Sequence, residues 1–163
     1  MTDKEQAFWQ KVKRFPLDEA GAAFPFSARL AKENGWTAEY TLRAMLEYKR
    51  FIFLICHTGS TCAPSDPVDQ VWHLHLLYTR SYWIDFCRHT LQQDIHHGPT
   101  RGGQAEGQKH ENLYANTLAL YRETFRKESP ADIWPEPGKQ YEKKDWLRIA
   151  RSDYYLIKKP FKT

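Results

Sequence analysis

The fold is decided by residues 65–91, which read SDPVDQVWHLHLLYTRSYWIDFCRHTL. Ser65-Asp66-Pro67 is a helix-start signal, because proline fits the first helical turn, where its missing N–H needs no partner. The residues that follow are apolar on nearly all sides, which is typical of a buried helix. We therefore predict a buried central helix over residues 68–91, and residues 79–81 are where it would break or kink.

Helical patterns flank this stretch on both sides. Thr2 and Glu5 have capping-box spacing, and Pro16 follows the end of this first helix at about residue 14. A short helix near residues 27–32 ends at Asn34-Gly35. Two longer helices, from Thr37 to about residue 57 and over residues 104–127, each present an apolar face at helical spacing. These faces consist of Tyr40, Ala44, Tyr48, Phe51 and Ile55, and of Leu113, Tyr114, Thr117, Leu118, Tyr121 and Phe125.

Length and composition predict the domain organisation. The 163 residues, of which 41% are hydrophobic, suffice for one domain with a real core. We predict an all-α fold with negligible strand. A single compact helical domain covers residues 1–137, and Trp134 packs back onto its body. Residues 138–163 form an irregular, basic C-terminal extension. Residues 139–163 hold eight Lys or Arg against three Asp or Glu, with aromatic residues between them. An anionic partner, a protein or a nucleic acid, is therefore the partner expected for the extension.

Composition also excludes several classes of protein. No apolar run approaches the roughly 18–20 residues of a membrane-spanning helix, and no secretory leader is recognised. Aromatic residues at 15% and charges of mixed sign exclude a wholly disordered chain. Three cysteines are too few for a disulfide scaffold, so we expect reduced thiols and a cytoplasmic protein.

The histidines point to a metal site. Four of the seven lie in two groups, His73-Leu74-His75 and His96-His97, and a close pair joined by a ligand from a later loop is a usual way to build a zinc site. In a helix, His73 and His75 point about 200° apart and cannot share one ion, whereas Asp69 and His73 share a face. If residues 71–76 were extended instead, His73 and His75 would share a face.

We favour the helix, and it predicts Asp69, His73 and His97 as metal ligands, with His75 as a further ligand or a hydrogen-bonding partner. Zinc is the first metal expected and iron the second. Glu106, four residues before His110 on the next helix, is the candidate catalytic residue. It is either a fourth ligand or general base, or an exposed acid in a first helical turn.

Several of these residues resemble the motif of the glycine-rich domain-containing protein-like family, known from plants and bacteria through a Val-Asp-x-Val-Trp-His-x-His core. The core matches at Val68, Asp69, Val71, Trp72, His73 and His75, and further matches are Tyr48-Lys49-Arg50-Phe51, Tyr82, Cys87 and His97. The resemblance covers roughly residues 37–135 and implies that Asp69, His73, His75, Cys87 and His97 act together. It implies no particular reaction, and the glycine-rich portion of the plant members has no counterpart among the eight glycines of this sequence.

Two functions stay open at this point, and the residues do not decide whether the protein is an enzyme. With one coordination position open to water, a His/carboxylate metal site would hydrolyse or hydrate a small substrate; a closed site would be structural. The alternative is a non-enzymatic interaction module. Its histidines would form a buried hydrogen-bond network, and its basic extension would bind a protein or a nucleic acid.

Overall fold

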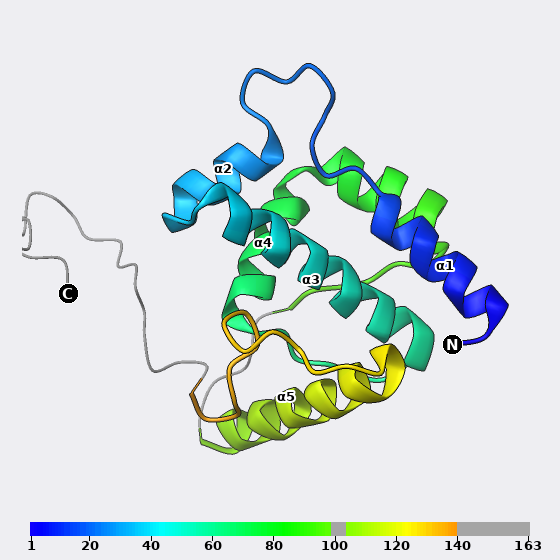
Figure 1. Cartoon of the computed structure of the whole chain (residues 1–163), viewed down its shortest axis with the longest axis vertical. Coiled ribbons are helices and arrows are strands. Elements are labelled where there is room, and N and C mark those ends of the chain that lie inside the picture. Colours follow the sequence, from blue (N-terminus) through cyan, green and yellow to red (C-terminus); the bar gives the residue numbers. More distant parts are fainter. Residues whose placement is uncertain (99–103, 140–163) are drawn as a thin grey trace, which may run out of the picture.

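The protein is helical throughout the part of the chain that its computed structural model describes, residues 1–98 and 104–139. No strand occurs within these ranges, and the predicted all-α fold is confirmed. For residues 104–106 only the backbone is described. Most of the predicted basic extension, residues 138–163, falls on residues 140–163 and so lies outside the described residues. The helices, shown in Figure 1, are α1 (Asp3–Arg14), α2 (Phe26–Asn34), α3 (Ala38–Thr58), α4 (Asp66–Leu77), the π-helix η1 (Arg80–Leu91) and α5 (Gln104–Phe125).

Helix α3 is the centre of the packing. It contacts α1, α2, α4 and α5, and it crosses the middle of the molecule in Figure 1. Its residues Tyr48, Phe51 and Ile52 have no exposed surface. The prediction that residues 68–91 form the central helix is therefore wrong, because the side of α4 that carries Leu77, 73% exposed, faces solvent.

Residues 68–91 also form two helices rather than one. Helix α4 ends at Leu77, and Tyr78 leaves the helical conformation with φ −86° and ψ 64°. The chain restarts as η1, whose wider turns bring the Thr90 side chain to the Asp85 carbonyl oxygen, 2.8 Å away. The predicted break at residues 79–81 thus lies next to the observed one. A π-helix of this length is rare, and such segments often occur at functional sites.

The structure confirms helix ends that the sequence predicts, both at N-termini and at C-termini. At the start of α1, Thr2 and Glu5 form a reciprocal capping box. Helices α2 and α3 are each followed by a capping glycine, Gly35 and Gly59, with φ values of 65° and 63° that favour glycine. Among the helices of the described part, none combines the length and apolar character needed to cross a membrane.

Replacing the capping residue of α3 is expected to cost about 1 kcal/mol of unfolding free energy. The Thr37 hydroxyl oxygen accepts a hydrogen bond from the Tyr40 backbone N–H at 3.2 Å, and Thr37→Ala leaves that donor to solvent. Urea denaturation measures the loss, and Thr37→Ser is the control because serine keeps the acceptor. Equal stability of the alanine and serine variants would contradict this role.

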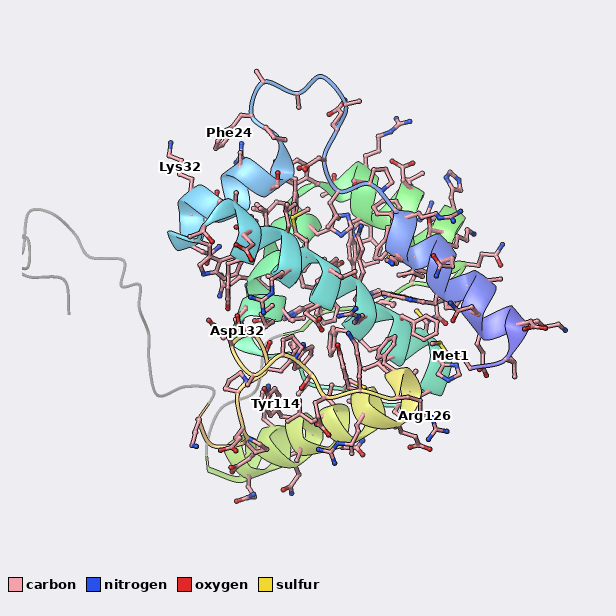
Figure 2. The ribbon with its side chains drawn as sticks, in the orientation of Figure 1. Met1, Phe24, Lys32, Tyr114, Arg126 and Asp132 are labelled. Atoms are coloured by element: carbon pink, nitrogen blue, oxygen red, sulfur yellow. The ribbon has the colours of Figure 1, made fainter. Side chains whose placement is uncertain are left out.

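The segment after α5 folds back over α3 and α5. Trp134 is buried, as predicted, and its indole N–H donates to Glu47 Oε2 on α3 at 3.0 Å. The Tyr114 hydroxyl of α5 donates to the Pro135 carbonyl oxygen at 2.7 Å. Figure 2 shows Tyr114 on the side of α5 that faces this segment and Asp132, which comes earlier in the segment, beside α3. Asp132 forms an ion pair with Arg43 at 2.6 Å.

Candidate functional site

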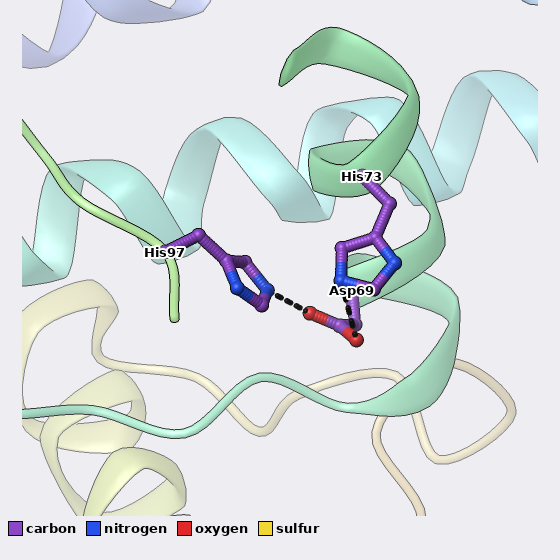
Figure 3. A group of neighbouring side chains, drawn as sticks. All are labelled: Asp69, His73 and His97. Carbon is purple, nitrogen blue, oxygen red and sulfur yellow. Dashed lines mark hydrogen bonds and ion pairs between the residues drawn. The ribbon is translucent and has the colours of Figure 1, made fainter. Parts of the chain in front are cut away.

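One carboxylate and two imidazoles from separate segments meet beside α4. Asp69 lies in the first turn of α4 and His73 one turn later, so helical geometry places both on one face. His97 comes from the loop that follows η1. Figure 3 shows Asp69 between the two rings. Asp69 Oδ1 is 2.6 Å from His97 Nε2, and Asp69 Oδ2 is 3.5 Å from His73 Nε2.

The three side chains are able to hold a metal ion. Each offers one ligand atom, and these atoms all lie within 4.8 Å of one another. In a tetrahedral zinc site, ligand atoms about 2.0–2.1 Å from the metal are roughly 3.3 Å apart. The Asp69–His73 separation is close to that value. For such a site, the separation between His97 Nε2 and Asp69 Oδ1 would be somewhat less than an ångström longer than the 2.6 Å of their hydrogen bond.

The site lies at the edge of the core. The exposed fraction falls from 55% at His73 through 27% at Asp69 to 17% at His97. The Trp72 ring packs edge-on against His97, with ring centroids 4.3 Å apart, and the centroids of His73 and His97 are 4.6 Å apart. Solvent therefore reaches the site from the His73 side, while Trp72 closes it toward the interior.

The loop that carries His97 is held by the η1 residue Tyr82. The Tyr82 hydroxyl donates to the Ile95 carbonyl oxygen at 2.5 Å and accepts a hydrogen bond from the Trp72 indole N–H at 2.9 Å. All three residues are buried. A single hydroxyl thus connects α4, η1 and the loop. Burial also raises the pKa of Tyr82, so this hydroxyl keeps its proton at any physiological pH.

The three side chains line a pocket of about 610 Å³. This volume falls within the range of ligand-binding pockets. The pocket runs from the start of α4 to the first half of α5, and part of its wall is apolar. Other lining residues include Pro64, Asp66, Trp72, His96, His110 and Leu113.

His75 is not part of this cluster. It is fully buried on the opposite side of α4, where the Tyr48 hydroxyl lies 2.9 Å from Nδ1 and the Ser81 hydroxyl 3.1 Å from Nε2. Burial, reinforced by the positive charge of Lys49, lowers the pKa of His75 to about 3, so its ring is neutral. Of the two roles predicted for His75, the structure matches the hydrogen-bonding one. The extended alternative for residues 71–76 is wrong, because α4 continues to Leu77.

The remaining candidates lie elsewhere or outside the description. Glu106 is in the first turn of α5, in the part whose side chains are not described, so its catalytic role stays a prediction. Cys87 is buried, and burial raises the pKa of its thiol, which makes it a core residue rather than a nucleophile. The link through Tyr82 was missed by sequence reasoning, although the motif resemblance had already singled out that residue.

Comparisons with known proteins place the chain in a family. A family model described as UCP032817-like matches residues 25–131. Glycine-rich domain-containing protein 1 of Arabidopsis thaliana is 26% identical over 130 residues, which cover 77% of this chain and 16% of that protein. Glycine-rich domain-containing protein 2 of the same plant is 26% identical over 106 residues, 62% of this chain and 13% of that protein. The chain thus spans less than a fifth of either relative, and no solved structure matches it.

The matched region and the site coincide. Residues 25–131 run from the start of α2 past the end of α5 and include Asp69, His73 and His97. The resemblance to glycine-rich domain-containing proteins that the sequence suggested is confirmed at the level of the family. Because the family model spans well over half of its residues, this chain belongs to the UCP032817-like family.

Proposed function

We propose that the protein binds one divalent transition-metal ion through Asp69, His73 and His97. The single observation that carries this proposal is the convergence of three ligand atoms, from α4 and from the loop after η1, within 4.8 Å. Zinc is the first candidate, because two imidazoles and a carboxylate are a frequent catalytic zinc set. Iron(II) is the second, because the same set binds iron in many oxygenases.

We further propose that the bound metal serves hydrolysis or hydration of a small substrate. Three protein ligands leave coordination positions open, which is the arrangement of catalytic rather than structural zinc sites. The pocket of about 610 Å³ beside the ligands offers space for a substrate. Bound there, zinc would supply Lewis-acid activation of water near neutral pH. Trp72 and the other lining residues would orient the substrate and exclude bulk water from one side.

Removing one ligand is expected to abolish stoichiometric binding. Untagged wild-type protein should bind close to one zinc ion per chain in calorimetric titration. His97→Ala should weaken affinity by more than the roughly 10–100-fold that loss of a supporting partner costs. The matched control is His89→Ala. His89 forms an exposed pair with Asp85 four residues earlier, at 3.8 Å, that resembles the Asp69–His73 pair, but the described part of the chain brings no third ligand to it.

The outcomes separate binding from catalysis. Wild-type protein that takes up neither zinc nor iron, or a His89→Ala variant that loses as much affinity as His97→Ala, would contradict the metal site. For the reaction, p-nitrophenyl esters and phosphate esters serve as probes, with and without one equivalent of zinc. Rates that are identical with and without the metal on every probe would contradict the hydrolytic proposal and leave metal binding intact.

One observation favours the alternative function, an interaction module without catalysis. The buried Tyr48–His75–Ser81 chain is the kind of histidine network on which that hypothesis relies. It involves one histidine only, whereas His73 and His97 face the pocket. A chelator discriminates between the two functions, because only the metal site predicts a lower melting temperature when the ion is removed.

A further inference from the structure

The position of His97 depends on contacts outside the candidate site itself. Asp69 and His73 share α4, so the helix fixes their relative position. His97 belongs to the loop after η1, and besides the bond between His97 and Asp69 this loop is hydrogen-bonded to the core at Ile95, two residues earlier. The Ile95 carbonyl oxygen accepts from the Tyr82 hydroxyl at 2.5 Å.

The same hydroxyl reaches back to the helix that carries the other two ligands. Tyr82 accepts the indole N–H of Trp72 at 2.9 Å. Trp72 directly precedes His73 in the chain and packs edge-on against the His97 ring, with centroids 4.3 Å apart. The Tyr82 oxygen is therefore the shared point through which the separation between α4 and the loop is set.

Burial makes this link rigid. Tyr82 has no exposed surface, and Trp72 and Ile95 are 5% and 6% exposed. Water has no access to replace either hydrogen bond if the hydroxyl is removed. A buried acceptor without a partner is costly, so the loop would move to satisfy the Ile95 carbonyl group elsewhere.

We propose that Tyr82 is a positioning residue for the metal site. Its hydroxyl fixes the Ile95 backbone and thereby holds the His97 imidazole at ligand distance from Asp69 and His73. This inference rests on the proposed metal-binding function and adds to it a residue of η1 that touches none of the three ligands through a hydrogen bond. Sequence separation hides the role, because Tyr82 lies thirteen residues before its acceptor.

The test compares two tyrosine-to-phenylalanine variants that each lose one buried hydroxyl. Tyr82→Phe is expected to weaken zinc affinity about 10–100-fold, the usual cost of losing a partner that orients a ligand. Tyr121→Phe is the matched control. The Tyr121 hydroxyl is also buried, but it bonds to Glu47 and Arg50 in another part of the core. It should change zinc affinity less than about twofold, because distant sites are usually independent. Affinity is measured with zinc alone against a chelating indicator at a temperature where circular dichroism shows both variants folded.

Two further readouts distinguish positioning from general loosening of the fold. The absorption spectrum of the cobalt-saturated protein should change in Tyr82→Phe and not in Tyr121→Phe, because it reports the ligand geometry. In a His97→Ala background, Tyr82→Phe should change the remaining affinity less than about twofold, since no His97 ring is left to position. Equal zinc affinity in the two phenylalanine variants would overturn the inference. So would a loss of zinc affinity on Tyr82→Phe that is equally large in the wild-type and in the His97→Ala background.

Failure of the inference differs from failure of the proposed function. If wild-type protein binds neither zinc nor cobalt, the metal site itself is refuted. If Tyr82→Phe does not fold, Trp72→Phe takes its place, because it removes the indole N–H that joins α4 to the Tyr82 hydroxyl. That variant should weaken zinc affinity by at least about threefold on the same reasoning, and unchanged affinity would overturn the proposal.

Discussion

Replacing Glu47 by alanine is expected to lower the free energy of unfolding by about 3–5 kcal/mol, because it breaks a buried ion pair. Glu47 is 3% exposed, although it carries a carboxylate. It forms an ion pair with Arg50 one turn later on α3, and it accepts from the Tyr121 hydroxyl at 3.3 Å and the Trp134 indole N–H at 3.0 Å. Removing it leaves the largely buried Arg50 guanidinium without its counter-charge, which costs far more than the pair contributes.

The control is an exposed ion pair that joins the same helix to the same C-terminal segment. Arg43 and Asp132 are 44% and 50% exposed at the side chain, so Asp132→Ala should cost less than about 1 kcal/mol. Changing Glu47→Gln and Arg50→Met together should restore part of the stability lost in Glu47→Ala, because no buried charge then remains unpaired. Urea denaturation measures all three variants. A loss below about 1 kcal/mol in Glu47→Ala would contradict a buried network at this position.

The second large effect is a loss of stability in acid that depends on His75. The pKa of this buried ring is about 3 in the folded protein, against 6.5 for an unperturbed histidine. Between these values the unfolded chain binds a proton that the folded protein does not. Stability from this residue is therefore complete above about pH 6.5 and falls as the pH decreases toward 3, by up to about 1.4 kcal/mol per pH unit.

The measurement compares wild type with His75→Gln from pH 7.5 to 4.5 in the presence of a chelator. The stability difference between the two should be constant above pH 7. Below pH 6.5 it should shrink by about 2–3 kcal/mol over two pH units, because only the wild type carries the titrating ring. His89→Gln is the control, since His89 is 70% exposed at the side chain. Parallel stability curves for wild type and His75→Gln at all pH values would show that His75 does not titrate in this way.

Local sequence signals predicted the elements well. The capping threonines and the glycine at position 35 act on the backbone within one turn, and the structure confirms the helix ends that they mark. On α4, helical spacing sufficed to put Asp69 and His73 on one face and His75, two residues after His73, on the other, because helical geometry alone fixes those directions.

Non-local features were predicted less well. No glycine or proline lies between Val68 and Leu91, so neither usual helix breaker marks the end of α4 at Leu77. The central position of α3 was also missed, because apolar content shows that a helix is buried but not which neighbours surround it. Glu47, Tyr121 and Trp134 meet across as many as 87 residues, and nothing in their local sequence indicates the partnership.

By itself, the sequence determined that this chain is helical, where most helices begin and end, and which ligand-type residues share a face of α4. Those properties follow from interactions within a few residues, which the local order of side chains fixes. Only the tertiary structure decided that His97 approaches Asp69 and His73, that His75 turns into the core and that Tyr82 ties the loop to α4. Such contacts depend on how whole helices pack against α3, and that packing is set by the burial of many side chains at once.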